Sequence, residues 1–171
     1  MPEVIRRSSV EPDTFTFVGL EAGAETAALP AGAIAVPLAL WKQRRAELLA
    51  RAEPLGVWLE PTDAPEALVE DLDGLALVAV RFPKFTDGRG YSTAVLLRRA
   101  GYRGELRAFG DLGRDQLFYL SRVGFDAFTL RPGADALGAL RSLRDFSEVY
   151  QGSVNQPAPL FCRRETAGTT R

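Results

Sequence analysis

The sequence contains no histidine and only one cysteine, Cys162. Without histidine the chain lacks the side chain best suited to proton transfer near neutral pH, which excludes a His-assisted triad and a His-ligated zinc or haem. A single cysteine excludes an intramolecular disulfide and a multi-thiolate metal site within one chain. Any chemistry must therefore use carboxylates, Lys, Tyr, Arg, Ser, a partner or a bound cofactor, which the sequence does not identify.

Long hydrophobic runs are also missing. The longest nearly uncharged apolar stretch, Leu29 to Trp41, has thirteen residues and is interrupted by Pro30, Gly32 and Pro37. A membrane-spanning helix needs roughly 20 apolar residues. The first seven residues are followed by polar residues instead of an apolar signal-peptide core. We expect a cytoplasmic protein that does not enter a membrane.

The chain has no excess of charge of one sign, with 21 basic and 22 acidic residues. This balance gives no reason to expect binding to nucleic acid or to an anionic membrane. A length of 171 residues suits one domain with a hydrophobic core. We expect an N-terminal β appendage over residues 1–28 with a strand at 14–20 and a loop at 21–28, a single domain over 29–150, and a tail over 151–171.

From about residue 33 short β-branched or aromatic runs alternate with longer segments of helical period. The pattern predicts an α/β fold of about five consecutive βα units with a mainly parallel sheet. The predicted strands are 33–36, 56–60, 75–81, 105–109 and 126–130. The predicted helices are 38–52, 65–72, 92–100, 114–123 and 135–150.

Two of these segments carry strong patterns. Leu75 to Val80 form a continuous apolar run, which is typical of a central strand covered on both faces. Within 135–150, Leu137, Leu140, Leu143 and Phe146 recur at intervals of three and predict a buried stripe. Consecutive βα units form either an open flavodoxin-like sheet or a partial barrel, and spacing does not choose between them.

The loop from Arg81 to Ser92 is the main candidate for a functional site. It is long, dense in charge and follows the most apolar strand, at the end of the sheet where α/β proteins bind ligands. Lys84 and Asp87 are the candidate catalytic residues of this loop. The candidate ligand-binding residues, which include cations for an anion and a proton-handling tyrosine, are Arg81, Arg89, Gly90, Tyr91 and Ser92.

The same loop also has a purely structural interpretation. Asp87 and Gly88 form a common turn, Arg89 pairs with Asp87, and Phe82 and Phe85 anchor the core. In that interpretation the loop binds nothing.

Two further loops follow predicted strands. Asp111 is a candidate catalytic base, and Asp115 and Gln116 are candidate ligand-binding residues at the start of the next helix. Aspartates in such positions also cap helices, which is the competing structural role. Arg131 offers a cation at the rim of a ligand site, and Asp135 is the expected N-cap of the last helix.

Four segments together resemble a bacterial family of unknown function, and the resemblance covers roughly residues 35 to 163. These segments are Arg81 to Ser92, Gly104 to Ala108, Gly110 to Gln116, and Arg122 to Asp126. Members of that family are commonly labelled as oxidoreductases involved in sulfite reduction. The resemblance implies a place in sulfur assimilation, with sulfite reductase as the expected partner.

Three functions are compatible with these observations. The first is an accessory protein of assimilatory sulfite reduction that binds an anionic small molecule or the reductase through its strand-end loops. The second is an independent oxidoreductase or acid–base enzyme using Lys84, Asp87 and Asp111. The third is a non-catalytic interaction module that forms a homodimer, since a small open sheet leaves edges to protect.

Overall fold

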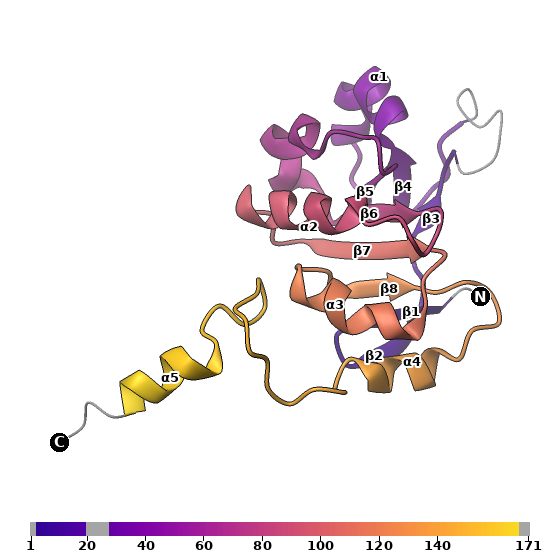
Figure 1. The fold of residues 1–171 in the computed structure, drawn as a ribbon. Coiled ribbons are helices and arrows are strands. Elements are labelled where there is room, and N and C mark those ends of the chain that lie inside the picture. The colour runs from indigo at the N-terminus through magenta and orange to yellow at the C-terminus, as the bar shows by residue number, and fades with distance from the viewer. Residues whose placement is uncertain (1–2, 20–27, 168–171) are drawn as a thin grey trace.

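The computed structural model describes residues 3–19 and 28–167, and within these an eight-stranded sheet is the central element. The strand order is β2-β1-β8-β7-β6-β5-β4-β3 (Figure 1). The strands are β1 (Glu3–Arg6), β2 (Ser9–Pro12), β3 (Thr16–Phe17), β4 (Ile34–Pro37), β5 (Leu55–Leu59), β6 (Leu77–Phe82), β7 (Glu105–Gly110) and β8 (Ala127–Thr129).

The sheet is mixed. Strands β3 to β8 lie side by side in chain order and all pair in parallel. A doubly wound, flavodoxin-like sheet would reverse its strand order, so that alternative is wrong. The α/β class is confirmed, and the curled sheet has the shape of a half-barrel (Figure 1).

The N-terminal region is β structure that belongs to the same sheet. Strand β1 pairs antiparallel with β8, and β2 pairs antiparallel with β1. The strand predicted at 14–20 is reduced to β3, which pairs with β4. The loop predicted at 21–28 lies almost entirely outside the described residues.

The helices follow the strands. They are α1 (Leu38–Leu49), the 3₁₀ helix η2 (Pro65–Gly74), α2 (Arg89–Arg99), η3 (Arg114–Gln116), α3 (Leu117–Arg122), α4 (Ala136–Ser142) and α5 (Leu160–Ala167). Helix α5 lies inside the segment predicted as a tail. None of the helices in the described part of the chain has the length and hydrophobicity that crossing a bilayer requires.

The prediction of one long helix over 135–150 is wrong, because α4 ends at Ser142. Residues three apart are about 300° apart around a helix, so four residues at that interval spread over about half its circumference. They therefore do not form one buried stripe. Leu137 and Phe146 are in fact 65% and 61% exposed, whereas Leu140 and Leu143 pack against the core. Asp135 does cap α4, since its carboxylate accepts from the Gly138 amide at 2.8 Å.

Strand β6 lies at the centre of the sheet, as its apolar run predicts. Its residues Leu77, Val78, Ala79 and Val80 are fully buried. Val78 and Val80 face the large core between the sheet and the helices, whereas Leu77 and Ala79 face a smaller core on the other side.

The smaller core fills the side of the sheet that carries no helices. Its members are Phe15, Phe17, Ala35, Trp58, Leu77, Ala79 and Phe109. Strands β2 and β3 lie at opposite edges of the sheet, and only the residues between Pro12 and Thr16 connect them. The connecting segment therefore crosses this face of the sheet. The Phe17 ring lies 5.0 Å from the Phe109 ring of β7. The N-terminal segment thus covers the inner face of the half-barrel.

A buried ion cluster lies beside this core. Arg107 of β7 is fully buried, and its Nη1 lies 2.7 Å from Asp13 Oδ2. Its Nε donates to Glu105 Oε1 at 2.8 Å, and the guanidinium lies 5.6 Å from the ring centroids of both Phe15 and Phe17. The cluster attaches the N-terminal segment to the sheet.

Candidate functional site

The loops that follow β6 and β7 meet at the carboxyl end of the sheet. The Phe85 amide donates to Asp111 Oδ2 at 3.3 Å, and Gln116 Nε2 donates to the Phe85 carbonyl oxygen at 2.8 Å. The Gln116 Oε1 also accepts from the Gly113 amide at 3.0 Å. Asp111 and Gln116, both predicted from the sequence, therefore fix the position of the loop that contains Lys84 and Asp87.

Both predicted arginines of the loop after β6 are engaged in ion pairs. Arg81 Nη1 lies 2.6 Å from Glu60 Oε1. Arg89 binds Asp87 through Nε at 3.0 Å and Nη2 at 2.6 Å, and these hydrogen bonds hold the pKa of the Asp87 carboxyl below its ordinary value. The structural pairing of Arg89 with Asp87 is thus confirmed. Among the described residues, Lys84 is exposed and has no ion-pair partner.

Gly90 lies against the buried ring of Phe82. A Cβ atom on Gly90 would lie 2.5 Å from Phe82 Cζ, so close packing requires glycine here. The core role expected of Phe82 is confirmed, because it is 1% exposed, but that of Phe85 is wrong, because it is 64% exposed.

Tyr91 is half-buried and Ser92 is exposed on α2. The Tyr91 ring packs edge-on against Phe82 with centroids 5.8 Å apart, and burial raises the pKa of its hydroxyl. The helix predicted to begin at Ser92 begins three residues earlier. Helix α2 begins at Arg89 after the N-cap residue Gly88, so Ser92 lies inside its first turns.

A cavity of about 780 Å³ opens beside these loops, at the carboxyl ends of β7 and β8. Its lining is mainly apolar and comes from Glu3, Ile5, Phe109, Gly110, Asp111, Phe128, Thr129, Leu130, Arg131, Pro132, Gly133, Ala134 and Ala136. The volume lies within the roughly 300–1,000 Å³ typical of small-molecule sites.

Four polar side chains line the cavity, and they belong to Glu3, Asp111, Thr129 and Arg131. Thr129 pairs with Phe109 in the sheet, and its Oγ1 is buried without a hydrogen-bond partner among the described residues. Asp111 follows β7, and Arg131 follows β8, with Arg131 Nη1 3.7 Å from Asp111 Oδ1. Arg131 is 71% exposed at its side chain, so the guanidinium remains accessible to a ligand.

Asp111 connects the cavity with the loop after β6, because its second oxygen accepts from the Phe85 amide. Of the residues predicted as a site, the structure places Asp111 and Arg131 in the cavity lining. Arg81, Lys84, Asp87, Arg89 and Ser92 lie outside this lining, and Asp115 is exposed on η3.

Sequence reasoning did not identify Thr129 or the contribution of β1 to the cavity. Thr129 lies next to Phe128 within a predicted strand. Because successive side chains of a strand point to opposite faces of the sheet, this alternation was the available signal that Thr129 and Phe128 face opposite sides. Glu3 and Ile5 stood in a segment expected to be separate, and no local pattern indicates that β1 pairs with β8. No group of three or more His, Cys, Asp or Glu residues that could hold a metal occurs in the described part of the chain.

Comparison with protein-family models gives a match over residues 56–161 to the family described as bacterial protein of unknown function (DUF934). The chain belongs to the DUF934 family. The matched region of this DUF934 protein includes the loops after β6, β7 and β8, whereas β1, which adds Glu3 and Ile5 to the cavity, precedes it. No curated protein and no solved structure matches the chain.

Proposed function

We propose that this protein binds a small organic anion in the cavity at the carboxyl ends of β7 and β8, and that it serves as an accessory protein in sulfite reduction. The observation that carries the proposal is the accessible Arg131 guanidinium at a mainly apolar cavity, whose lining also includes Thr129. Thr129 Oγ1 has no hydrogen-bond partner among the described residues, so rotation of this side chain toward a bound ligand would gain a hydrogen bond without breaking one.

The shape and composition of the cavity favour an organic molecule over a bare inorganic ion. Ile5, Phe109, Phe128 and Leu130 supply apolar wall, and a cavity of about 780 Å³ is large for a single oxyanion. Small-molecule sites typically combine such apolar walls with a few polar groups that set orientation. An oxyanion group of the ligand would bind Arg131, because guanidinium forms bidentate hydrogen bonds with carboxylate or phosphate-like groups.

Asp111 has a positioning role in this proposal. Its carboxylate faces Arg131 on one side and fixes the Phe85 amide on the other. A ligand oxyanion that approaches Arg131 competes with Asp111 for the guanidinium. Binding of an anion would therefore weaken the Asp111–Arg131 contact and alter the loop that contains Lys84 and Asp87.

The first test is thermal unfolding in the presence of sulfite, sulfate, adenylyl sulfate, NAD(H), NADP(H) and FAD. A ligand at 100 times its Kd adds about 2.7 kcal/mol, which raises the midpoint by roughly 5–11 °C in a protein of this size. The expected shift is largest with a probe that joins an oxyanion to an apolar body. It should fall in Thr129→Val, which keeps the shape without the hydroxyl, and in Arg131→Ala.

The matched control is Arg141→Ala, which removes an exposed arginine of α4 outside the cavity lining. A shift that persists unchanged in both Thr129→Val and Arg131→Ala would place binding elsewhere. The sulfur assignment is tested separately by deleting the gene and measuring growth on sulfite. Slow growth that cysteine rescues supports it, and normal growth contradicts it while leaving the binding site intact.

A further inference from the structure

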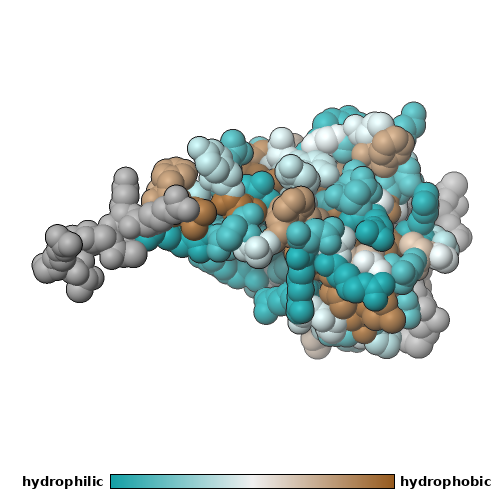
Figure 2. Space-filling view, turned by 60° about the horizontal axis from the view of Figure 1, so that its bottom comes forward, coloured by the Kyte–Doolittle hydropathy of each residue, from teal (hydrophilic) through white to brown (hydrophobic). Residues whose placement is uncertain are grey.

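Hydrophilic side chains cover much of the protein surface. Figure 2 shows them over much of the face it presents, with hydrophobic residues in separate groups. Many of the described arginines are bound to carboxylates. Arg7 and Arg103 are exposed and, among the described residues, neither side chain forms a hydrogen bond or an ion pair. Both of them line a second cavity.

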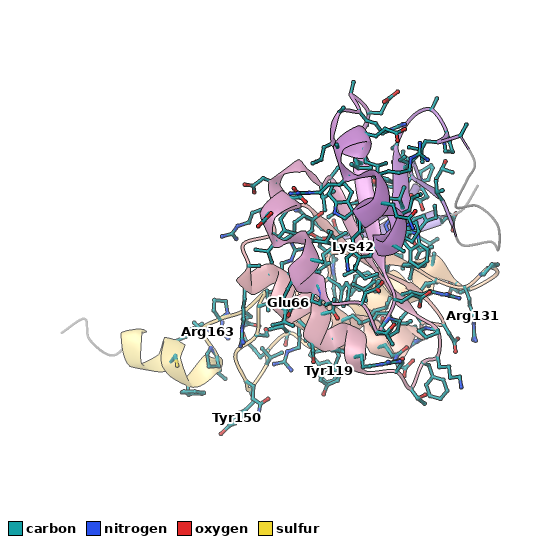
Figure 3. The ribbon with its side chains drawn as sticks, turned by 90° about the horizontal axis from the view of Figure 1, so that it is seen from above. Lys42, Glu66, Tyr119, Arg131, Tyr150 and Arg163 are labelled. Atoms are coloured by element: carbon teal, nitrogen blue, oxygen red, sulfur yellow. The ribbon has the colours of Figure 1, made fainter. Side chains whose placement is uncertain are left out.

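The second cavity lies where β7 and β8 begin, whereas the first cavity, described above, lies where these strands end. Its wall includes Val154 of the C-terminal segment, and Phe128 of β8 contributes to both cavities. Figure 3 shows Arg131, which lines the first cavity, on the side of the molecule opposite Tyr150 and Arg163 of the C-terminal segment. The two cavities therefore open at different places on the protein.

Positive charge exceeds negative charge in the second cavity. It measures about 520 Å³, and its charged lining residues are Arg7, Arg98, Arg103 and Asp126. Arg98 Nη2 lies 3.0 Å from Asp126 Oδ2, so these two charges offset each other. Burial raises the pKa of Asp126, whereas Arg98 and, more weakly, Arg7 lower it. The charges of Arg7 and Arg103 are left without an ion-pair partner among the described residues.

A smaller adjoining cavity of about 370 Å³ is also lined by Arg7 and Arg103. Its other cation, Arg6, is paired with Glu11 at 3.3 Å and with Glu105 at 2.7 Å. These carboxylates are therefore occupied by Arg6. The excess of positive charge lies where the two cavities meet.

Arg98 already offsets the carbonyl oxygens near the ends of α2 and α3. Its Nε donates to the Gly124 carbonyl oxygen at 2.9 Å, and its Nη1 donates to those of Tyr102 and Gly104 at 2.9 and 3.0 Å. Helix C-termini carry a partial negative charge that a nearby cation stabilises. Because Arg98 fulfils this role, the two exposed arginines are available to a ligand.

The backbone of Arg7 gives no reason for an arginine at this position. Arg7 and Ser8 form the two-residue turn between Arg6 and Ser9, and Arg7 has a φ of +48°, which no other described non-glycine residue matches in sign. Turns with positive φ favour Gly, Asn or Asp, and strained residues cluster at functional sites. The Arg7 amide donates to the Asp126 carbonyl oxygen at 3.1 Å, which holds the turn against the cavity.

We propose that the second cavity binds a small phosphate monoester, with the phosphate group held by Arg7 and Arg103. Guanidinium groups form charge-assisted, bidentate hydrogen bonds with phosphate. Two unpaired arginines match the charge of a monoester, which is about −1.5 to −2 near neutral pH. The cavity is large for a bare ion, and Phe125, Leu143 and Val154 supply apolar wall for the organic part.

The first test is a titration of the isotope-labelled protein with phenyl phosphate, slightly above neutral pH and at constant ionic strength. The amides of Gly124 and Asp126 should shift progressively, because both residues line the second cavity. Phenyl phosphate should bind at least about tenfold more tightly than phenyl sulfate, which carries a single charge, and than inorganic phosphate, which has no apolar part. Arg131→Ala should leave this affinity unchanged, so the result is independent of the first cavity.

Substitution of the two arginines decides whether they form the site. Arg7→Gly and Arg103→Gln should each weaken phenyl phosphate binding by about tenfold or more. Arg99→Gln, which removes an exposed arginine of α2 outside both cavities, is the matched control and should bind normally. Arg7→Gly should also keep or raise the thermal midpoint, because glycine adopts positive φ without strain.

Three results would overturn the proposal. The first is an affinity unchanged in both Arg7→Gly and Arg103→Gln, or no shifts with phenyl phosphate at all. The second is equal affinity for phenyl phosphate and either of the two comparison anions. The third is a lower thermal midpoint in Arg7→Gly, which would give this arginine a structural role instead.

Discussion

The buried ion cluster of Arg107, Asp13 and Glu105 leads to a prediction about stability. The perturbation is Asp13→Ala, which removes one of the two carboxylates bound to a fully buried guanidinium. Removing one partner of a buried ion pair costs about 3–5 kcal/mol because the remaining charge is left uncompensated. Glu105 still binds Arg107, so we expect the lower end, about 3 kcal/mol.

This loss corresponds to a fall in the thermal midpoint of roughly 6–12 °C for a chain of this size. It should be measured by urea unfolding with tryptophan fluorescence, because Trp58 belongs to the same inner core. Asp13→Asn should also destabilise, because its one amide oxygen cannot accept from both the Phe15 amide and Arg107 Nη1, and its NH2 group would face a second donor.

The control and a double variant decide whether charge is the cause. Glu47→Ala removes an exposed carboxylate paired with Arg44 and should leave the unfolding midpoint unchanged. Asp13→Leu/Arg107→Met replaces the buried pair by apolar groups and should be more stable than Asp13→Ala. Unfolding of Asp13→Ala at the wild-type urea concentration would refute the reasoning.

Three further predictions concern packing and titration. Gly90→Ala should lower the free energy of unfolding by about 1–3 kcal/mol, because the added Cβ would clash with Phe82 and this cost exceeds the better helix propensity of alanine. Gly74→Ala is the control, since its nearest contact lies at 3.5 Å, and it should not destabilise. Denaturant unfolding measures both variants. Burial raises the pKa of Tyr102, so its hydroxyl should be the last tyrosine to ionise when the pH is raised. Tyr102→Phe should therefore remove the last phase of the tyrosine absorbance change in an alkaline titration. Tyr91→Phe is the control and should leave that phase in place. Burial also raises the pKa of Asp126, so the folded state holds this proton more tightly than the unfolded state does, and the group stabilises the protein most at low pH. As the pH rises from about 4, the wild type should therefore lose stability relative to Asp126→Asn. A difference in unfolding free energy that stays constant with pH would contradict this.

Local patterns predicted the elements whose environment is set by neighbouring residues. The apolar run of β6 requires cover on both faces, and it lies at the centre of the sheet. The Asp87–Arg89 pair also follows from sequence proximity. Asp111 and Arg131 line the cavity because the parallel strands before them end at the same edge.

Long-range pairing was beyond local patterns. Arg107 is a charged residue within a strand, and one of its two carboxylate partners, Asp13, comes from a distant segment of the chain. Strand β1 joins the sheet through β8 near the other end of the domain, and this pairing brings Ile5 to the cavity. An interval of three residues does not mark a single face of a helix, so this pattern does not predict where α4 ends.

The binding of an organic anion at the ends of β7 and β8 is tested most directly by amide chemical-shift mapping. The isotope-labelled protein would be titrated with whichever of the probes named above raises the thermal midpoint most. The account predicts progressive shifts of the Gly110, Thr129 and Arg131 amides, which line the cavity, with Arg141 unaffected. Shifts confined to other parts of the molecule, or no shifts with any of the probes, would contradict it.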